Sequence, residues 1–228
     1  MGNNYLIISD LQIPYEAPKA LKFCLQVKKE FKISDSCVYN VGDEVDLFHA
    51  STHPKTADYD ITPKQERNIT KEKMKEWGSA FPYMWLCTSN HGIRWARKAS
   101  LSDIPSEILR DYADIIGAPK NWRWKDQWII KEKNPFMVMH GLGYNGQMAH
   151  RQSAMDMGMS VCHGHLHSSA GISYITTQTQ KIFGFNTGCL IDVNSFAFKY
   201  GKWSRFKPSL GVGVVINNGS TPIWIPYE

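Results

Sequence analysis

The sequence Tyr5-Leu-Ile-Ile-Ser-Asp10 is an apolar run that ends on a carboxylate, and Val38-Tyr-Asn-Val-Gly-Asp43 repeats this arrangement. Residues 17–31 between the two runs carry apolar side chains at a helical spacing, with lysines between them. A strand–helix–strand unit of this length predicts parallel pairing of the two strands through a right-handed crossover. The sequence therefore predicts an α/β fold.

Further apolar runs, at residues 85–89, 136–139 and 160–162, are also followed by side chains of the kind that bind metals. These side chains are Asn90, His91, His140, His165 and His167. Ligands of open α/β sheets bind beyond the carboxyl ends of the strands, so we expect these side chains to converge there. Buried carboxylates and imidazoles gather chiefly at metal or catalytic centres, and the pattern therefore predicts such a centre.

The rest of the chain is consistent with a single domain, residues 1–228. We expect a polar insertion at about 47–82 that contains a charged helix at about 62–80. Residues 121–140 are predicted to form two strands around a turn. The alternating pattern of residues 172–226 predicts antiparallel strands.

Composition indicates a protein without membrane segments, because 43% of residues are hydrophobic and no apolar run approaches the ~20 residues that span a bilayer. The N-terminus lacks the features of a secretory signal. The chain has five cysteines and no Cys-x-x-Cys pair, which favours buried thiols, Cys162 among them, and a cytoplasmic location. The net charge of +5 favours an anionic substrate without establishing nucleic acid.

The motifs together resemble the signature of the calcineurin-like metallophosphoesterase family, which runs Asp-x-His, Gly-Asp-x-x-Asp, Gly-Asn-His-Asp/Glu, an isolated His and Gly-His-x-His. The matching segments stand in the same order: Asp10-Leu-Gln12, Gly42-Asp-Glu-Val-Asp46, Ser89-Asn-His-Gly92, His140 and Gly164-His-Leu-His167. The resemblance covers residues 10–167. It implies a four-layer αββα sandwich, with two mixed β-sheets flanked by helices, and a dinuclear phosphoester hydrolase.

By the same resemblance, Asp43 would bridge two metal ions that share a hydroxide, and this hydroxide would attack phosphorus in line. The first metal site would take Asp10, Gln12, Asp43 and His167. The second metal site would take Asp43, Asn90, His140 and His165. His91 would serve the leaving oxygen as the catalytic histidine, and Asp46 would orient it through a hydrogen bond to the ring.

Gln12 is the main departure, because it offers a neutral amide oxygen where the family has an imidazole nitrogen. A harder donor set favours Mn²⁺ or Mg²⁺ over Zn²⁺, so we expect the first site to bind more weakly and to prefer Mn²⁺. The alternative is that Gln12 makes no metal contact. The expected cofactors are two divalent ions, with Mn²⁺ favoured and Mg²⁺, Fe²⁺ or Zn²⁺ as alternatives. Gly92 also departs, since it removes the acidic residue that usually follows His91. Ser89 replaces the glycine of the family, a smaller change that affects how tightly the strand turns.

Substrate contacts are predicted from basic and aromatic residues. Arg94 is a candidate forked donor for a phosphate, whereas Arg97 is expected on a solvated helix face. Trp122, Trp124 and Trp128 either stack on bases or pack a hairpin on the core. Among the remaining histidines, His163 is expected to be structural, and surface positions are expected for His49, His53 and His150.

The sequence therefore favours a phosphodiesterase of the nuclease-like kind, which acts on nucleotides or nucleic acid such as DNA. A phosphomonoesterase and a cyclic-nucleotide phosphodiesterase are the alternatives within the same chemistry. An alternative of another class is a metal-dependent binding or scaffold module whose catalysis has weakened through Gln12 and Gly92. The sequence leaves the oligomeric state open.

Overall fold

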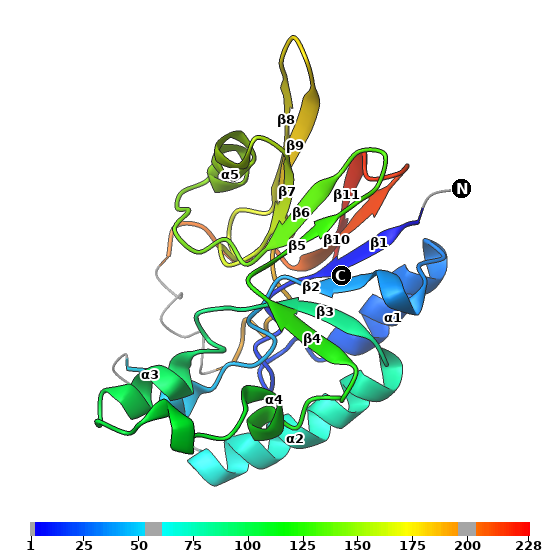
Figure 1. The fold of residues 1–228 in the computed structure, drawn as a ribbon. Coiled ribbons are helices and arrows are strands. Elements are labelled where there is room, and N and C mark those ends of the chain that lie inside the picture. The colour runs from blue at the N-terminus through cyan, green and yellow to red at the C-terminus, as the bar shows by residue number, and fades with distance from the viewer. Residues whose placement is uncertain (1–2, 53–60, 196–203) are drawn as a thin grey trace.

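The computed structural model describes residues 3–52, 61–195 and 204–228. The chain has an α/β fold with two mixed β-sheets, one of six strands and one of five (Figure 1). The coarse fold class predicted from the sequence is therefore correct. Among the described residues, no helix is both long and apolar enough to cross a membrane.

The first sheet has the strand order β11-β10-β1-β2-β3-β4. Its strands are β1 (Tyr5–Ile8), β2 (Val38–Asn40), β3 (Met84–Cys87), β4 (Trp122–Lys125), β10 (Gly211–Ile216) and β11 (Thr221–Pro226). Strands β1 to β4 run parallel, while β10 and β11 join the edge in antiparallel pairings. Every residue of β1 is buried, which explains why its sequence is apolar without alternation.

The second sheet has the strand order β5-β6-β7-β9-β8. Its strands are β5 (Gln127–Ile130), β6 (Phe136–Met139), β7 (Ser160–His163), β8 (Gly171–Thr176) and β9 (Lys181–Asn186). Strands β6, β7 and β9 run parallel, and β5 and β8 are antiparallel edge strands. The antiparallel tail predicted for residues 172–226 is confirmed for β8–β9 and β10–β11, except that β9 also pairs in parallel with β7.

Residues 121–140 differ from the prediction of two strands, because they form three. Strand β4 pairs with β3 in the first sheet, and β5 pairs with β6 in the second. Asp126 alone separates the two strands, and its carboxylate accepts a hydrogen bond from Thr88 Oγ1 at 2.6 Å. The partners of these strands lie far apart in the sequence, so the local alternation of residues did not reveal the change of sheet.

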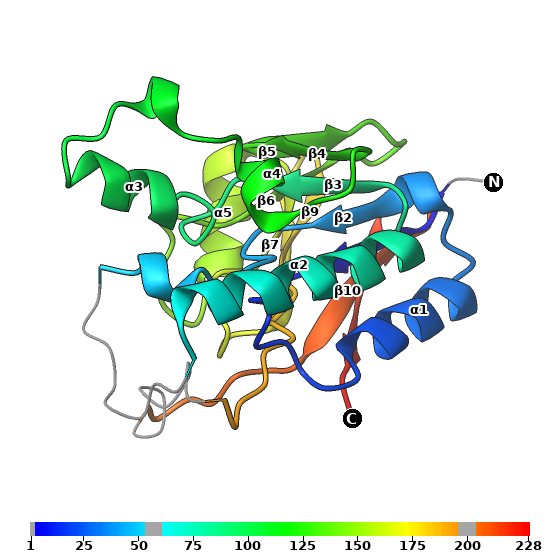
Figure 2. The ribbon, with the colours of Figure 1, turned by 90° about the horizontal axis from the view of Figure 1, so that it is seen from below.

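Helices α1 (Ala20–Glu30) and α2 (Pro63–Ala80) lie side by side along the six-stranded sheet (Figure 2). The predicted charged helix is confirmed as α2, which begins with a capping box between Thr62 and Gln65. Residues 53–60 of the predicted insertion lie outside the described residues.

The other helical elements are α3 (Arg94–Ser100), α4 (Tyr112–Ile116), α5 (Ala149–Met157), η1 (Asp35–Cys37), η2 (Phe48–Ala50) and η3 (Ser106–Ile108). Helix α5 packs on β7, β8 and β9, so both sheets carry helices. All five cysteines are buried free thiols, as predicted.

Candidate metal centre

The predicted ligands all lie in loops that follow the carboxyl ends of strands, as the sequence analysis expected. Asp10 follows β1, Asp43 follows β2 and Asn90 follows β3 in the first sheet, while His140 follows β6 and His165 follows β7 in the second. The site is therefore assembled from loops of both sheets.

The loops after β1 and β2 continue the pairing of their strands. The backbone N–H of Gln12 donates to the carbonyl oxygen of Asp43 at 2.8 Å, and that of Ile13 donates to Glu44 at 3.0 Å. Strand pairing in the first sheet thus extends into the site and sets the two loops, with their buried carboxylates Asp10 and Asp43, side by side.

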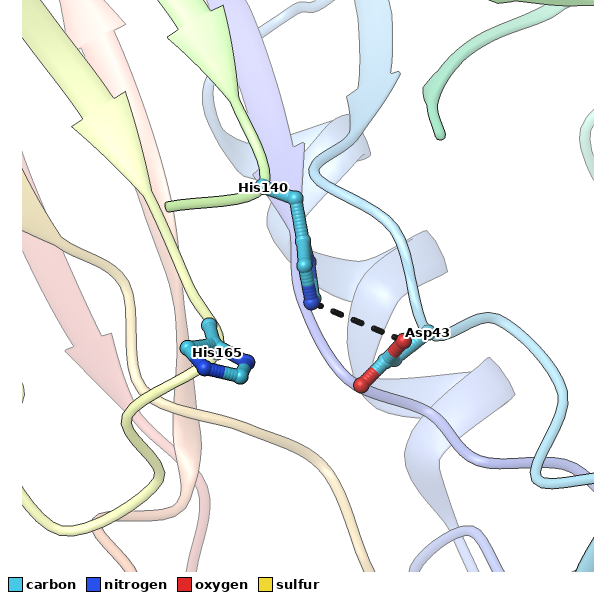
Figure 3. A group of neighbouring side chains, drawn as sticks. All are labelled: Asp43, His140 and His165. Atoms are coloured by element: carbon cyan, nitrogen blue, oxygen red, sulfur yellow. Dashed lines mark ion pairs between the residues drawn. The ribbon is translucent and has the colours of Figure 1, made fainter. Parts of the chain in front are cut away.

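One set of ligands, called here the His140 group, consists of Asp43, Asn90, His140 and His165. Ligand atoms of Asp43, His140 and His165 all lie within 4.8 Å of one another, and the three side chains point toward a common space (Figure 3). His140 Nε2 is 3.6 Å from Asp43 Oδ1 and 2.7 Å from Asn90 Oδ1.

The tautomer of His140 follows from its other ring nitrogen. His140 Nδ1 lies 3.0 Å from the carbonyl oxygen of Val41, which can only accept a hydrogen bond, so Nδ1 carries the proton. In the neutral ring, Nε2 then presents a lone pair toward the oxygens of Asn90 and Asp43. A histidine that donates to a backbone carbonyl while its second nitrogen faces carboxylate and amide oxygens has the arrangement of a metal ligand.

The second set, called here the Asp10 group, consists of Asp10, Gln12 and His167. His167 Nε2 lies 3.1 Å from Asp10 Oδ1 and 3.1 Å from Gln12 Nε2. Gln12 is buried, and its Oε1 has no hydrogen-bond partner in the described part of the chain. A buried amide oxygen without a partner is costly, and a cation would satisfy it. A ligand role for Gln12 stays a prediction, with the absence of metal contact as its alternative, and this unpartnered oxygen is the atom that would contact the metal.

The charges of the Asp10 group offset one another. Burial alone would raise the pKa of Asp10, but the hydrogen bond and charge of His167 lower it below its ordinary value. Burial alone would lower the pKa of His167, but the hydrogen bond to Asp10 raises it. In the His140 group, by contrast, burial lowers the pKa of His165, and the neighbouring His140 adds to this effect.

Several predicted ligands adopt a left-handed backbone conformation that non-glycine residues rarely use. The φ angles are 44° for Asp10, 49° for Gln12, 52° for Asp43 and 66° for His165. Such conformations cost free energy and persist only where the surrounding structure holds them, which is typical of functional sites. Positive φ angles also occur outside the site, at Lys32, Leu47, Asp103, Asn217 and Asn218, so the backbone agrees with the sequence motifs but does not single out their residues.

Glycine is required at two positions where backbone and ligands approach closely. A Cβ atom at Gly164 would collide with Ser9 Oγ and Asp10 Oδ2. A Cβ atom at Gly42 would lie 2.9 Å from His140 Nδ1, and the φ of Gly42 is 113°. The glycines of the Gly-Asp and Gly-His motifs therefore make room for the ligands.

The predicted pair of Asp46 and His91 differs in detail from the expectation. Asp46 Oδ2 is 3.9 Å from His91 Nδ1, which is too long for the expected hydrogen bond. Asp46 instead accepts from Arg94 Nη1 at 2.7 Å, and Arg94 Nη2 donates to His91 Nε2 at 2.6 Å. Arg94, predicted to bind substrate, thus also connects the acid to the histidine. Its long side chain reaches both partners because α3 begins at this residue.

The ionisation of this trio follows from its burial. Burial raises the pKa of Asp46 to about 7, against the opposing charge of Arg94. Burial lowers the pKa of His91 to about 4, and the charge of Arg94 acts in the same direction, whereas Asp43 opposes it. A neutral His91 ring is consistent with an Nε2 that accepts from Arg94.

The structure adds residues whose contribution the sequence analysis missed. Ser89 Oγ accepts hydrogen bonds from the backbone N–H of Asp43 at 3.0 Å and of Gly92 at 3.2 Å, so it fixes the Asp43 loop to the His91 loop. Glu44 is buried beside the site and accepts from Tyr112 Oη at 2.7 Å. In the sequence, a serine or an acidic residue next to a motif residue looks like any polar residue of a loop. These contacts therefore could not be predicted from the sequence.

The tryptophans serve packing. The indole N–H of Trp122 donates to Phe81 O, that of Trp124 to Glu44 Oε1 and that of Trp128 to Leu86 O. Trp122 is buried in the main core. These residues therefore follow the packing alternative, and base stacking on them loses its support.

Two further histidines are buried outside the donor groups. His163 is buried and its Nδ1 lies 2.9 Å from Gly164 O, which agrees with the expected structural role. His150 was expected on the surface, but it is buried in α5 and contacts Ser173 Oγ at 2.9 Å, because α5 packs on β8 and β9. His49 is half-buried, and His53 lies outside the described residues.

No protein-family model matches the chain, and no curated protein matches its sequence. What the site does must therefore be inferred from its residues and their geometry.

Proposed function

We propose that this chain is a metal-dependent phosphoester hydrolase with a dinuclear centre, and that its two sheets belong to the four-layer αββα arrangement of the metallophosphoesterases. Its proposed substrates are phosphodiesters of nucleotides or nucleic acid. The proposal rests on the order of the motifs together with the geometry of the site.

The observation that carries the proposal is the convergence of two donor groups from five loops. The His140 group gathers lone pairs that face one another, and the Asp10 group contains a buried amide oxygen without a partner among the described residues. Both features fit divalent cations, because one cation can satisfy His140 Nε2 together with the Asn90 and Asp43 oxygens that face it, and another can satisfy the amide oxygen of Gln12.

The residues divide between two cations as the motifs imply. The Asp10 group would hold one ion and the His140 group the other, with Asp43 shared between them. The oxygen-rich Asp10 group favours Mn²⁺. When bound, such ions lower the pKa of a coordinated water and neutralise charge on phosphoryl oxygens.

The protein itself supplies positioning and proton control beside the metals. His91 Nε2 and Arg94 Nη2 meet at 2.6 Å, so they converge on one point next to Asp43. In the proposed reaction, Arg94 exchanges its bond to His91 Nε2 for a bond to a phosphoryl oxygen. The released Nε2 takes up a proton from solvent and donates it to the departing oxygen. Asp46 holds the Arg94 guanidinium through two contacts of 2.7 Å and thereby orients the pair indirectly.

Hydrolysis of bis-p-nitrophenyl phosphate with Mn²⁺ tests the proposed function. Turnover by the wild type and its loss in Asp43→Asn are the expected results, because Asp43 belongs to both metal sites. Asp114→Asn, an exposed carboxylate on α4, is the matched control and should retain activity. Equal turnover by the wild type and Asp43→Asn would contradict the proposal, as would metal-dependent partner binding without turnover of any phosphoester.

A further inference from the structure

A small polar hollow opens beside the candidate metal centre. It is lined by Ala50, Ser51, Thr52, Asn90, Arg94 and Arg97. Asn90 belongs to the His140 group and Arg94 contacts His91, so the hollow adjoins the point where the reaction is proposed to occur. Its described lining contains two guanidinium groups and no carboxylate.

The two arginines differ in how far their charges are offset. Arg94 is paired with the buried carboxylate of Asp46 at 2.7 Å. Arg97 is exposed, and within residues 3–52, 61–195 and 204–228 its side chain has no recorded hydrogen bond or ion pair. A guanidinium without an acidic partner that lines a polar hollow is suited to a phosphate, which it can bind through two parallel hydrogen bonds.

The wall of the hollow is fixed before any ligand arrives. The buried carboxylate of Glu66 on α2 accepts from the backbone N–H of Phe48 at 2.6 Å and of His49 at 3.1 Å. Lys98 of α3 donates to the carbonyl oxygen of His49 at 2.7 Å. The Glu66 contacts hold η2 to α2, and the Lys98 contact holds it to α3. A preformed wall lowers the entropic cost of binding.

The two arginines lie about one helical turn apart on α3. Residues three apart on a helix lie on one face with Cβ atoms about 5–6 Å apart. Arg97 is thus displaced from Arg94 by roughly one helical turn, away from His91 along α3. This offset is close to the step between successive phosphates of an extended nucleic-acid strand.

We infer that the Arg97 hollow binds the phosphate next to the one that is cleaved, so that the preferred substrate is a nucleic-acid strand or nucleotide with at least two phosphates. The inference rests on the proposed function and gives it a substrate class. Arg97 is exposed on α3, as the sequence analysis expected, and the inference adds a phosphate contact at that position.

The test compares two chromogenic substrates that differ by one phosphate. They are thymidine 5′-(p-nitrophenyl phosphate) and the same compound with a 3′-phosphate. With Mn²⁺, the wild type should have the higher kcat/KM on the two-phosphate compound. Arg97→Ala should reduce that kcat/KM about tenfold, since one charge-assisted contact is lost, and should change the one-phosphate value less than twofold.

Arg67→Ala is the matched control, because Arg67 is exposed on α2 and does not line the hollow. It removes the same charge and should leave the ratio of the two kcat/KM values unchanged. Equal losses on both substrates in Arg97→Ala would overturn the inference, and so would a wild type without preference for the second phosphate.

A binding measurement separates failure of this inference from failure of the proposed function. Calorimetric titration with Mn²⁺ compares thymidine 3′,5′-bisphosphate with thymidine 5′-monophosphate. Tighter binding of the bisphosphate that disappears in Arg97→Ala supports the hollow even if neither ester is hydrolysed. Equal affinities of the wild type for both ligands overturn it, whether or not the protein hydrolyses phosphoesters.

Discussion

The Asp10 group and the His140 group lie side by side but satisfy their polar atoms differently. Within the Asp10 group, the carboxylate and His167 form an ion pair at 3.1 Å, and their pKa values shift apart as such a pair requires. Within the His140 group, His140 Nδ1 donates its proton to the carbonyl oxygen of Val41. With the amide oxygen of Asn90 directed toward His140, Nε2 faces oxygen atoms that cannot donate a hydrogen bond to it.

This difference indicates which of the two groups depends more on a bound cation. A metal that enters the Asp10 group must displace the proton shared between His167 and Asp10, whereas a metal in the His140 group relieves opposed lone pairs. We therefore expect the His140 group to bind its ion more tightly. The amide of Gln12 widens the gap, because it is a weaker donor than an imidazole to borderline metals.

The largest effect is expected when a residue of the His140 group, the group expected to bind its ion more tightly, is replaced. His140→Ala should reduce kcat on bis-p-nitrophenyl phosphate by about a thousandfold, because it removes a ligand of the tightly bound ion. Elemental analysis after dialysis should show loss of the retained metal. His150→Ala, another buried histidine but outside both groups, should keep its metal content. Full retention of metal in His140→Ala would contradict the assignment.

A second variant tests the catalytic role of His91, which belongs to neither the Asp10 group nor the His140 group. His91→Ala should lower kcat by about a hundredfold while the metal content stays unchanged, since the histidine serves the departing oxygen and ligates neither ion. Metal content and steady-state kinetics on the same preparation provide the measurement. Loss of metal together with activity would place His91 in the coordination shell instead.

A third variant sharpens the comparison at Gln12. Gln12→His should tighten Mn²⁺ binding at the Asp10 group about tenfold and shift its preference toward Zn²⁺, because an imidazole replaces an amide oxygen. Calorimetric titration of the two sites supplies the measurement. Gln65→His, on α2, controls for an added histidine at a position of the capping box outside the site. If the first site keeps its affinity, Gln12 lies outside the coordination shell.

The smallest expected effect concerns the link between the loops. Ser89→Ala should lower the free energy of unfolding by about 1–3 kcal/mol, because two backbone N–H groups lose their acceptor. Urea denaturation measures this change. Ser79→Ala, whose hydroxyl makes an exposed contact with Lys75 O, should shift stability by less than about 0.5 kcal/mol. Equal shifts in the two variants would show that the Ser89 contacts contribute nothing.

The sequence predicted the positions of the candidate ligands better than their surroundings. Asp10, Asp43 and His140 were found because an apolar strand followed by a metal-type side chain is a local pattern, and parallel strands bring such ends together. The left-handed backbone of Asp10 and Asp43 could not be predicted, since it depends on contacts such as those of Ser89 and Gly164 that join distant segments.

Contacts between long side chains were also beyond the sequence. The bond from Arg94 to Asp46 and His91 depends on where α3 begins relative to the Asp43 loop, and no periodicity encodes that placement. Likewise, the residues around Asp126 show the same alternation on both sides, although β4 and β5 belong to different sheets. The burial of His150 followed from the docking of α5, which its own helical pattern did not specify.

The single residue between β4 and β5 has a mechanical consequence. The two sheets have little freedom to rotate about this connection, because it consists of Asp126 alone and the Asp126 carboxylate is hydrogen-bonded to Thr88. In the proposed enzyme, the candidate ligands from opposite sheets would then keep a nearly constant separation during turnover. Substrate entry and product release would then depend on motion of the loops around the site. We therefore expect turnover without a hinge motion of one sheet relative to the other.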